Sequence, residues 1–344
     1  MDKIIRTLKH SYFIITIVFF SFVIALHGCK NKVDNNSSEL NPTDPTLEEL
    51  NHWIENDPDN DSLYFRRANF LIKNESFDSA IIDLQKALSI DSTNKSYYYH
   101  VLSDAYLNNV DSKSAMKAMD KAMIYFPNDL ETILKSARLK LILKQHMSAL
   151  ATLDKVFMRD PQNAPGYYLA GHIFYEMGDT GRAVNSYQKA VDINPDMREA
   201  WIRIGDVLTE LKNPKAILYY DNAIRMDSLD AETWHNKAYA LNTLGKTKES
   251  LKLYIEICSR FPSYEPAYFN LGMLYKELDS IPLAIDHFTI SVQINPSEPT
   301  SYYQRGLCYQ KSGDKQKAQQ DFETALKLDD QFEEARLELK KLTR

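Results

Sequence analysis

Histidine and cysteine are the side chains most able to do chemistry, because they bind metal ions and act as bases or nucleophiles near neutral pH. The chain has eight histidines and three cysteines. His100, His172 and His235 lie about two units apart in the repeated pattern of the chain, which is too far for one metal site. The cysteines are widely spaced and form no Cys-x-x-Cys pair, which supports neither a zinc site nor a disulfide framework. We therefore predict no bound metal and no cofactor.

Sequence motifs of catalysis are missing as well. The chain has no glycine-rich phosphate loop, no Gly-x-Ser-x-Gly and no His-Glu-x-x-His. Cys258 and Cys308 fall inside helical segments and are expected to be packed thiols. The formal net charge is −6, and no basic stripe marks a surface for nucleic acid. The sequence predicts a protein without catalytic residues that is not an enzyme and has no nucleic-acid partner.

The third cysteine, Cys29, closes a leader with a distinct composition. Lys3, Arg6 and Lys9 precede an apolar run at residues 12–26. Fifteen residues of helix span roughly 22 Å, which is short of a hydrocarbon core of about 30 Å. A positive flank followed by a short apolar run is typical of an export signal.

The end of this run, Leu26-His27-Gly28-Cys29, resembles the bacterial lipobox. The resemblance implies that residues 1–28 are a lipoprotein signal peptide and that Cys29 is lipidated after cleavage. The alternative is an uncleaved membrane anchor with an incidental cysteine. Residues 29–45 are rich in Asn, Ser and Pro and are expected to form a flexible tether. Lys30 after the cysteine favours, by resemblance, the outer membrane of a Gram-negative bacterium, with the periplasmic or surface facing left open.

Small residues return about every 34 residues through the rest of the chain, and this period is typical of a helix-turn-helix solenoid. Each unit has two of them, about twelve residues apart, where two helices can approach closely. The earlier residue of each unit is Ala68, Ser103, Ala137, Gly171, Gly205, Ala238, Gly272 or Gly306. The later one is Ala80, Ala115, Ala149, Ala183, Ala216, Ser250, Ala284 or Ala318.

Large residues and turn residues complete the unit. Each second helix has a large residue four positions after its small one, expected to fill the space between the helices: Leu84, Met119, Leu153, Tyr187, Tyr220, Tyr254, Phe288 and Phe322. Gly178, Gly245 and Gly313 fall at the turn between the two helices, where a positive φ favours glycine. Proline follows five of the second helices.

The unit at residues 265–298 shows the pattern most completely, with an aromatic, Leu-Gly, Tyr, Ala, Phe and Pro in order. This pattern resembles the tetratricopeptide repeat. The resemblance covers residues 61–332 and implies an all-α fold, an α-solenoid of about eight repeats in a right-handed superhelix. Residues 46–60 and 333–344 are expected to form an N-terminal and a C-terminal capping helix, because terminal repeats need a polar outer face.

In this family the first helix of each repeat lines a concave groove that binds protein partners. The groove-facing side chains that are not needed for packing are rich in Tyr, Phe and His, which suits a protein-binding surface. The resemblance also implies that a series of carboxamides can hold an extended peptide backbone. The predicted protein-binding residues are Phe65, Tyr97, His100, Arg138, Tyr168, His172, Tyr175, Asp206, Asn236, Tyr239, Phe269, Asn270, Tyr303 and Gln304.

Together these features predict a membrane-anchored lipoprotein of the bacterial cell envelope that acts as a scaffold or assembly factor. Its expected partners are protein or peptide clients in the groove and the membrane through its lipid anchor. Two alternatives are a regulatory adaptor that recruits a cell-wall hydrolase and a structural component of a secretion or motility complex.

Overall fold

The computed structural model describes residues 45–342, and the regular secondary structure of these residues is entirely helical. The helices are α2 (Leu47–Asn56), α3 (Asp61–Lys73), α4 (Phe77–Ile90), α5 (Ser96–Asn108), α6 (Ser112–Tyr125), α7 (Leu130–Ile142), α8 (His146–Arg159), α9 (Ala164–Glu176), α10 (Thr180–Ile193), α11 (Arg198–Glu210), α12 (Ala216–Met226), α13 (Ala231–Thr243), α14 (Thr247–Arg260), α15 (Glu265–Glu277), α16 (Ile281–Ile294), α17 (Pro299–Ser312), α18 (Lys315–Leu328) and α19 (Glu333–Leu342).

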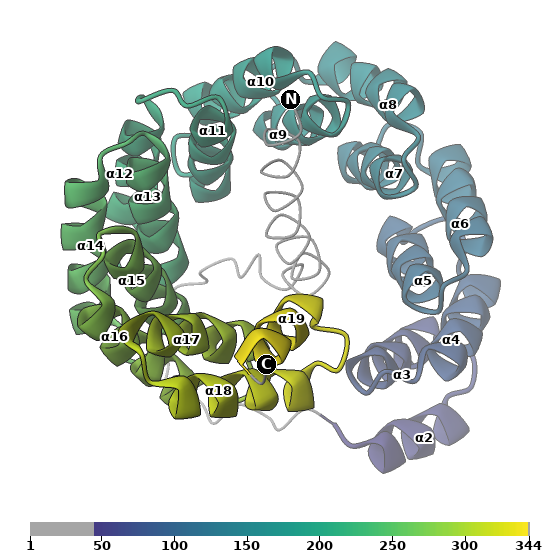
Figure 1. Cartoon of the computed structure of the whole chain (residues 1–344). Helices are drawn as coiled ribbons and strands as arrows, with labels where there is room; N and C mark the ends of the chain where they lie inside the picture. Colours follow the sequence, from purple (N-terminus) through teal and green to yellow (C-terminus); the bar gives the residue numbers. More distant parts are fainter. Residues whose placement is uncertain (1–44, 343–344) are drawn as a thin grey trace, which may run out of the picture. The chain divides into compact units, whose positions relative to one another are not determined.

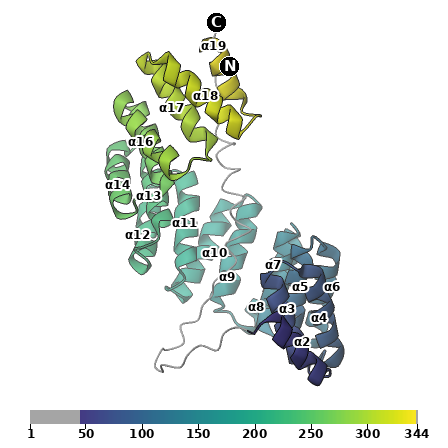
Figure 2. The same ribbon diagram turned by 90° about the horizontal axis from the view of Figure 1, so that it is seen from below.

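Within residues 50–342 the helices form consecutive hairpins, from α3 with α4 to α17 with α18, and each hairpin packs on the next. Among the odd-numbered helices, α7 contacts α5 and α9, α11 contacts α13, and α15 contacts α17. The odd-numbered helices α3 to α17 form the inner layer of the curved array, and α4 to α18 form the outer layer (Figures 1 and 2). The predicted α-solenoid is therefore confirmed, and the eight hairpins of the described residues are consistent with the predicted repeats.

The small and large residues of each unit interlock as predicted. A methyl group added at Gly171 would lie 2.5 Å from the ring of Tyr187, and one at Gly272 would lie 2.8 Å from the ring of Phe288. Gly205 and Gly306 stand in the same relation to Tyr220 and Phe322. All four rings are fully or almost fully buried. These glycines are therefore needed for close helix approach rather than for backbone freedom.

Four units have alanine or serine where the others have this glycine. In three of the four, the large residue of the second helix is aliphatic instead of aromatic. Ala68 is followed by Leu84, Ser103 by Met119 and Ala137 by Leu153, whereas Ala238 is followed by Tyr254. The serines of the series also bond across the hairpin, since Ser103 Oγ donates to the Ala115 carbonyl at 3.1 Å and Ser250 Oγ to the Ala238 carbonyl at 2.7 Å.

The turns inside the hairpins all place one residue in the left-handed region. Gly178, Gly245 and Gly313 have φ of 78°, 76° and 89°, as predicted. The same turn in the other units uses Glu75, Val110, Lys144, Lys212 and Asp279. Among these, Val110 is the strained one, because its β-branched side chain clashes with its own backbone at a φ of 59°.

Replacing Val110 by glycine is expected to raise the free energy of unfolding by about 1 kcal/mol. The replacement relieves the backbone strain of the left-handed conformation, and the greater conformational entropy of glycine in the unfolded chain offsets part of this gain. The side chain is 91% exposed, so little packing is lost. Urea unfolding followed by circular dichroism measures the change. Lys144→Gly at the equivalent turn is the matched control and should gain less, since lysine is not β-branched.

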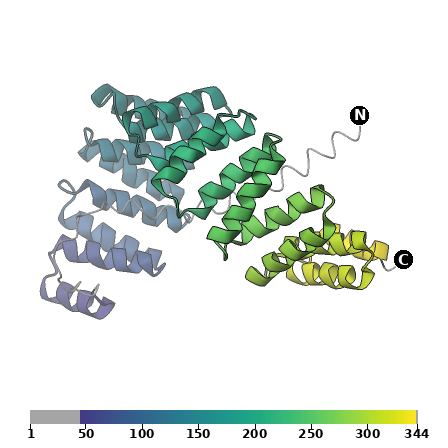
Figure 3. The ribbon, with the colours of Figure 1, turned by 90° about the vertical axis from the view of Figure 1, so that its left-hand side faces the viewer.

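Single helices, α2 and α19, stand at the two ends of the described chain. Thr46 and Glu49 form a capping box before α2, with Thr46 N donating to Glu49 Oε2 at 2.7 Å and Glu49 N donating to Thr46 Oγ1 at 3.2 Å. At the other end α19 packs on α18 and buries Ala335 (Figure 3). No helix among residues 45–342 is long and apolar enough to cross a membrane. The predicted signal peptide and Cys29 lie outside the described residues.

Candidate protein-binding surface

All fourteen predicted protein-binding residues lie on helices of the inner layer, because each belongs to the first helix of its unit. Their exposure differs widely. Tyr97 and Tyr239 are 44% and 51% exposed, and Arg138 is also exposed. The other predicted residues are partly buried, apart from His100. The inner layer thus presents exposed aromatic groups on α5 and α13, with half-buried rings between and beyond them.

His100 is a correction to the sequence prediction. It is only 2% exposed, and its Nε2 is hydrogen-bonded to Thr132 Oγ1 at 2.8 Å. The Thr132 hydroxyl donates to Asp129 Oδ2 at 2.6 Å, so the imidazole joins α5 to the start of α7. Burial lowers the pKa of His100. The side chain stabilises the stacking of two units and offers no surface to a partner.

The first aromatic group lies where α3 meets α5. Phe65 stacks on Tyr98 with ring centroids 4.5 Å apart and meets the edge of Tyr97 at 5.1 Å. The Tyr98 hydroxyl donates to Asp61 Oδ2 at 2.8 Å, and Lys95 Nζ lies 2.5 Å from the same oxygen. Phe65 and Tyr98 are thus fixed in place, which leaves Tyr97 as the exposed member of the group.

The middle of the inner layer holds a group of polar and aromatic side chains, which we call the central cluster: Tyr168, His172 and Tyr175 of α9 with Arg203 and Asp206 of α11. Their spacings of three or four residues place each set on one helix face. Tyr168 meets the edge of His172 with ring centroids 4.5 Å apart. Arg203 Nη1 lies 3.2 Å from Asp206 Oδ2.

Protein surrounds the central cluster, but solvent still reaches its charged groups. Loss of solvent is the largest influence on Asp206 and raises the pKa of its carboxyl, yet 27% of the Asp206 side chain and 34% of the Arg203 side chain stay accessible. Tyr220 belongs to α12 of the outer layer, and its hydroxyl donates to Asp206 Oδ1 at 2.9 Å. This hydrogen bond fixes the carboxylate.

Neighbouring groups tune the rest of the cluster. Burial lowers the pKa of His172 to about 3, and the charges of Arg203 and Arg138 add to this effect, so the imidazole is neutral at pH 7. The Tyr175 hydroxyl donates to Glu210 Oε1 at 2.5 Å, and burial raises the pKa of Tyr175. Arg203 and Glu210 were not among the binding residues predicted from the sequence. Arg203 lies three residues before Asp206 and Glu210 four residues after it, and this spacing places all three on one helix face. The sequence could have indicated them in this way.

The predicted carboxamide series is only partly available to a partner. Asn270 Nδ2 donates to the Pro266 carbonyl of its own helix at 2.8 Å. Gln304 Oε1 accepts from Lys276 Nζ at 2.7 Å. One polar atom of each amide is therefore engaged inside the chain, which weakens the case for paired hydrogen bonds to a peptide backbone.

The remaining predicted rings serve packing as well as the surface. Phe269 lies 5.7 Å from Phe288, and Tyr303 lies 5.0 Å from Phe332, both between ring centroids. His235 was not among the predicted binding residues, and it packs in a similar way, with its ring meeting the edge of Tyr254 at 5.5 Å. The Phe269 and His235 contacts hold the inner layer on the outer one, and the Tyr303 contact holds α17 on the connection before α19, so truncation of these rings would change stability and binding together.

Replacing His235 by phenylalanine is expected to flatten the loss of stability between pH 6.5 and pH 4. Burial lowers the pKa of His235 to about 4 from 6.5, so in this window the unfolded chain binds a proton that the folded chain does not. Stability therefore falls as pH falls, by up to about 3 kcal/mol for this group. Phenylalanine occupies the same position in the units of Phe65 and Phe269. Thermal melts of both proteins at several pH values measure the difference, and equal slopes would contradict the prediction.

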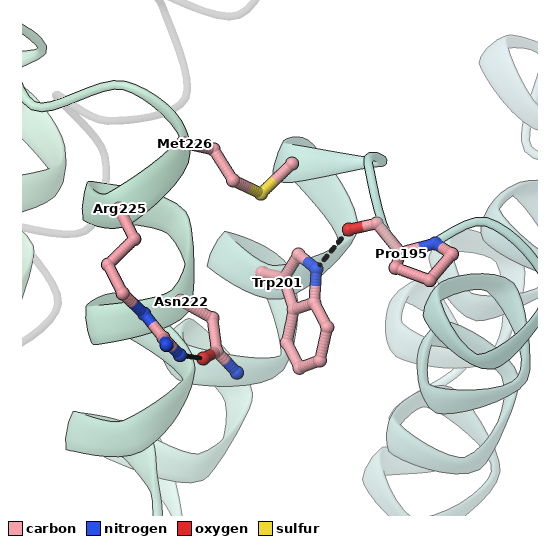
Figure 4. Close-up of a pocket in the computed structure, with 5 residues that line it drawn as sticks. All are labelled: Pro195, Trp201, Asn222, Arg225 and Met226. Atoms are coloured by element: carbon pink, nitrogen blue, oxygen red, sulfur yellow. Dashed lines mark hydrogen bonds between the residues drawn. The ribbon is translucent and has the colours of Figure 1, made fainter.

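A separate shallow pocket lies where α11 meets α12. It is lined by Pro195, Trp201, Asn222, Arg225 and Met226 (Figure 4). Trp201 Nε1 donates to the Pro195 carbonyl at 2.8 Å, and Arg225 bonds to Asn222. None of the predicted binding residues lines it. Among the described residues no group of three or more His, Cys, Asp or Glu could hold a metal ion.

The fold and the inner surface define the class of this protein as an α-solenoid of helical hairpins. Models of the tetratricopeptide repeat match residues 61–94, 171–211, 231–264 and 299–332. The chain therefore contains tetratricopeptide repeats. Proteins with these repeats act in protein–protein interaction and as assembly scaffolds, and the fold is generally non-catalytic.

Curated relatives are similar at low identity. The chain is 24% identical over 256 residues to the mouse Protein O-mannosyl-transferase TMTC3, covering 69% of this chain and 28% of the relative. It is 23% identical over 234 residues to the rice DnaJ protein P58IPK homolog B, covering 64% and 48%. The chain thus spans between about a quarter and a half of the length of these two relatives. The transferase activity in the name of the mouse protein is a property of that protein.

Among solved structures, a tetratricopeptide repeat protein from Parabacteroides merdae is similar with a TM-score of 0.52. The two chains are 18% identical, and the similarity covers 72% of this chain and 99% of the other. At this identity the likeness shows the shared fold.

Proposed function

We propose that this protein is a scaffold of the bacterial cell envelope that binds a segment of a client protein along its inner layer. The observation that carries the proposal is the exposure of Tyr97 and Tyr239 on that layer, on either side of the central cluster. Exposed tyrosines supply large contact areas at a small cost in side-chain entropy, as protein-binding surfaces require. The chemistry is docking, with no turnover of the client.

The proposed location rests on the leader. Positive charges, a short apolar run and the sequence Leu26-His27-Gly28-Cys29 support a lipid anchor at Cys29, most consistent with an outer membrane. The residues between Cys29 and α2 would then act as a tether that holds the array close to the bilayer. In this proposal the scaffold gathers its clients at the membrane surface.

The test is a double variant, Tyr97→Ser with Tyr239→Ser, compared with Tyr125→Ser. Tyr125 is 47% exposed but lies on α6 of the outer layer, so it controls for loss of an exposed tyrosine. Tyr168 and Tyr175 are less suitable, since they pack on Tyr187 and bond to Glu210.

The measurement is capture of client proteins from detergent-solubilised membranes, quantified by mass spectrometry. We expect the wild type and Tyr125→Ser to capture the same set of proteins in similar amounts. The double variant should capture about tenfold less of each or lower, as expected for the removal of two hot-spot residues. A photo-crosslinking residue at position 239, but not at position 125, should form adducts with the same proteins. Equal capture by all three proteins would exclude the inner layer as the binding surface.

A further inference from the structure

The two edges of the array differ in charge. The hairpins pack in series with the same orientation, so the turns inside them lie along one edge and the segments that connect them lie along the other. The turn edge consists of residues 74–76, 109–111, 143–145, 177–179, 211–215, 244–246, 278–280 and 313–314, and the connection edge of residues 91–95, 126–129, 160–163, 194–197, 227–230, 261–264, 295–298 and 329–332. The connection edge holds nine acidic residues and one basic residue, whereas the turn edge holds five acidic and four basic residues. An anionic surface would therefore be repelled by the connection edge far more than by the turn edge.

The middle of the turn edge is its basic part. The turns of the four hairpins from α7 with α8 to α13 with α14 contain one acidic residue, Asp179. They also contain all the basic residues of the turn edge: Lys144, Lys212, Lys215 and Lys246. Two of these lysines are paired, one with Glu176 at 2.8 Å and one with Glu249 at 3.4 Å. The middle of the turn edge is thus weakly basic.

Exposed apolar side chains accompany these lysines. Met177 is 38% exposed and Leu211 is 51% exposed, each in the turn of its hairpin. Apolar side chains beside lysines suit a bilayer surface, because the apolar groups enter the acyl boundary while the lysines stay at the lipid phosphates. The connection edge also has an exposed leucine, Leu229 at 80%, but it lies between Asp227 and Asp230, which would face the same phosphates.

The chain enters the array from the side of the turn edge. Ile54, near the end of α2, packs in one cluster with Tyr64 at the start of α3. Asn51, about one turn earlier in α2, accepts from Arg67 Nη1 at 2.7 Å, and Arg67 lies about one turn later in α3. Helix α2 therefore runs from the turn edge toward the connection edge. A coil of about sixteen residues would reach roughly 20–25 Å, so an anchor at Cys29 would bring the turn edge to the bilayer first.

We propose that the turn edge of these four hairpins docks on the bilayer that anchors the chain, with Met177 and Leu211 in the headgroup layer and the lysines at the lipid phosphates. The inference rests on the proposed function, since it needs an anchor at the amino-terminal end of the chain. A weak affinity for the bilayer is enough, because the tether holds the surface at a high effective concentration. Docking in this way turns the acidic connection edge toward solvent.

Labelling of lipids from the two edges tests the proposal. The protein carries a photo-crosslinking residue at position 211 or, as the matched control, at position 229, and is reconstituted in vesicles of phosphatidylcholine and phosphatidylglycerol. Both positions are exposed leucines between helices. We expect about fivefold or more lipid adduct from position 211 than from position 229. Equal labelling from both positions, or more from position 229, would overturn the proposal.

The lipid charge tests the part assigned to the lysines. Vesicles of phosphatidylcholine alone should give about twofold less adduct from position 211 or lower, because the lysines lose their anionic partners. Adduct that does not depend on phosphatidylglycerol would contradict the role of the lysines.

Variants of the apolar side chains separate docking from anchoring. Met177→Glu combined with Leu211→Glu should lower the lipid adduct from position 142 by about fivefold or more, since a charge opposes entry into the bilayer. Ile142 is the last residue of α7 and is 48% exposed. Leu229→Glu is the control and should leave this adduct unchanged. The double variant should stay in the membrane fraction and melt as the wild type does. Unchanged adduct in the double variant would overturn the docking.

Failure of the docking and failure of the proposed function give different results. The double variant should capture the clients of the inner layer as the wild type does, so loss of capture by the wild type would refute the client surface and leave the lipid adducts to decide the docking. If mass spectrometry finds no lipid on Cys29, the apolar run holds the chain in the membrane, and the same pattern of adducts is expected because the chain still enters α2 from the turn edge.

Discussion

Replacing Phe288 by alanine is expected to lower the free energy of unfolding by about 3–5 kcal/mol, the largest effect of any single change considered for the array. The ring is fully buried, and it lies against Gly272. Its removal leaves a cavity between two helices whose separation is fixed by the neighbouring units, so the site collapses only in part. Urea unfolding followed by circular dichroism measures the loss.

The close contact between residues 272 and 288 provides control variants for this experiment. Gly272→Ala alone should be destabilising by about 1–3 kcal/mol, because the new methyl group would meet the ring at 2.8 Å. Gly272→Ala combined with Phe288→Leu reproduces the pair found at Ala137 and Leu153 and should cost less than the sum of the two single changes. Leu283→Ala on the same helix, where the side chain is 44% exposed, should cost under about 1 kcal/mol. A loss for Phe288→Ala no larger than that of Leu283→Ala would contradict the packing described.

Replacing Cys29 by serine is expected to move the protein from the membrane fraction to the soluble fraction almost completely. Burial of an acyl chain contributes about 0.8 kcal/mol per methylene, and several chains on one residue make anchoring stable where one chain does not. In the proposed lipoprotein, removal of the Cys29 thiol removes every acyl chain at once. Fractionation of cells followed by immunoblotting measures the distribution, and mass spectrometry of the amino-terminal peptide detects the lipid.

Cys258→Ser is the matched control for this prediction. Cys258 is a half-buried thiol of α14, and burial raises its pKa to about 11, which keeps it unreactive at neutral pH. Its replacement should leave the distribution unchanged. If Cys29→Ser stays in the membrane fraction, the apolar run at residues 12–26 is an uncleaved anchor rather than a cleaved signal.

The periodic part of the fold could be predicted from sequence because each unit repeats the same packing problem. The glycines at positions 171, 205, 272 and 306 each precede a ring that needs the space, and the sequence shows both members of each pair. The left-handed turn residues were predicted only where they are glycine, since Val110 and Lys144 adopt the same conformation without its sequence signal.

The binding surface could be predicted less completely, because exposure depends on the neighbouring unit. His100 occupies the position of Tyr168 and His235 within the unit, but Thr132 of the next unit covers and bonds it. Arg203 occupies the position of Asn236 and Asn270 within the unit. The prediction for this position was based on the amide side chains and therefore did not include Arg203. Periodicity identifies the helix layer, whereas the contact of one unit with the next decides which side chains of that layer are free to bind.

The size matching inside the hairpins also limits how such an array can lengthen or shorten by recombination between its own repeats. A crossover between hairpins keeps each small residue with its own partner, such as Gly171 with Tyr187 or Ala137 with Leu153. A crossover inside a hairpin could join a glycine helix to a leucine one and leave a void, or join an alanine helix to an aromatic one, a pairing that the described hairpins contain only at Ala238 and Tyr254. Viable length variants of this gene should therefore differ by whole hairpins, with their junctions in the segments that connect one hairpin to the next.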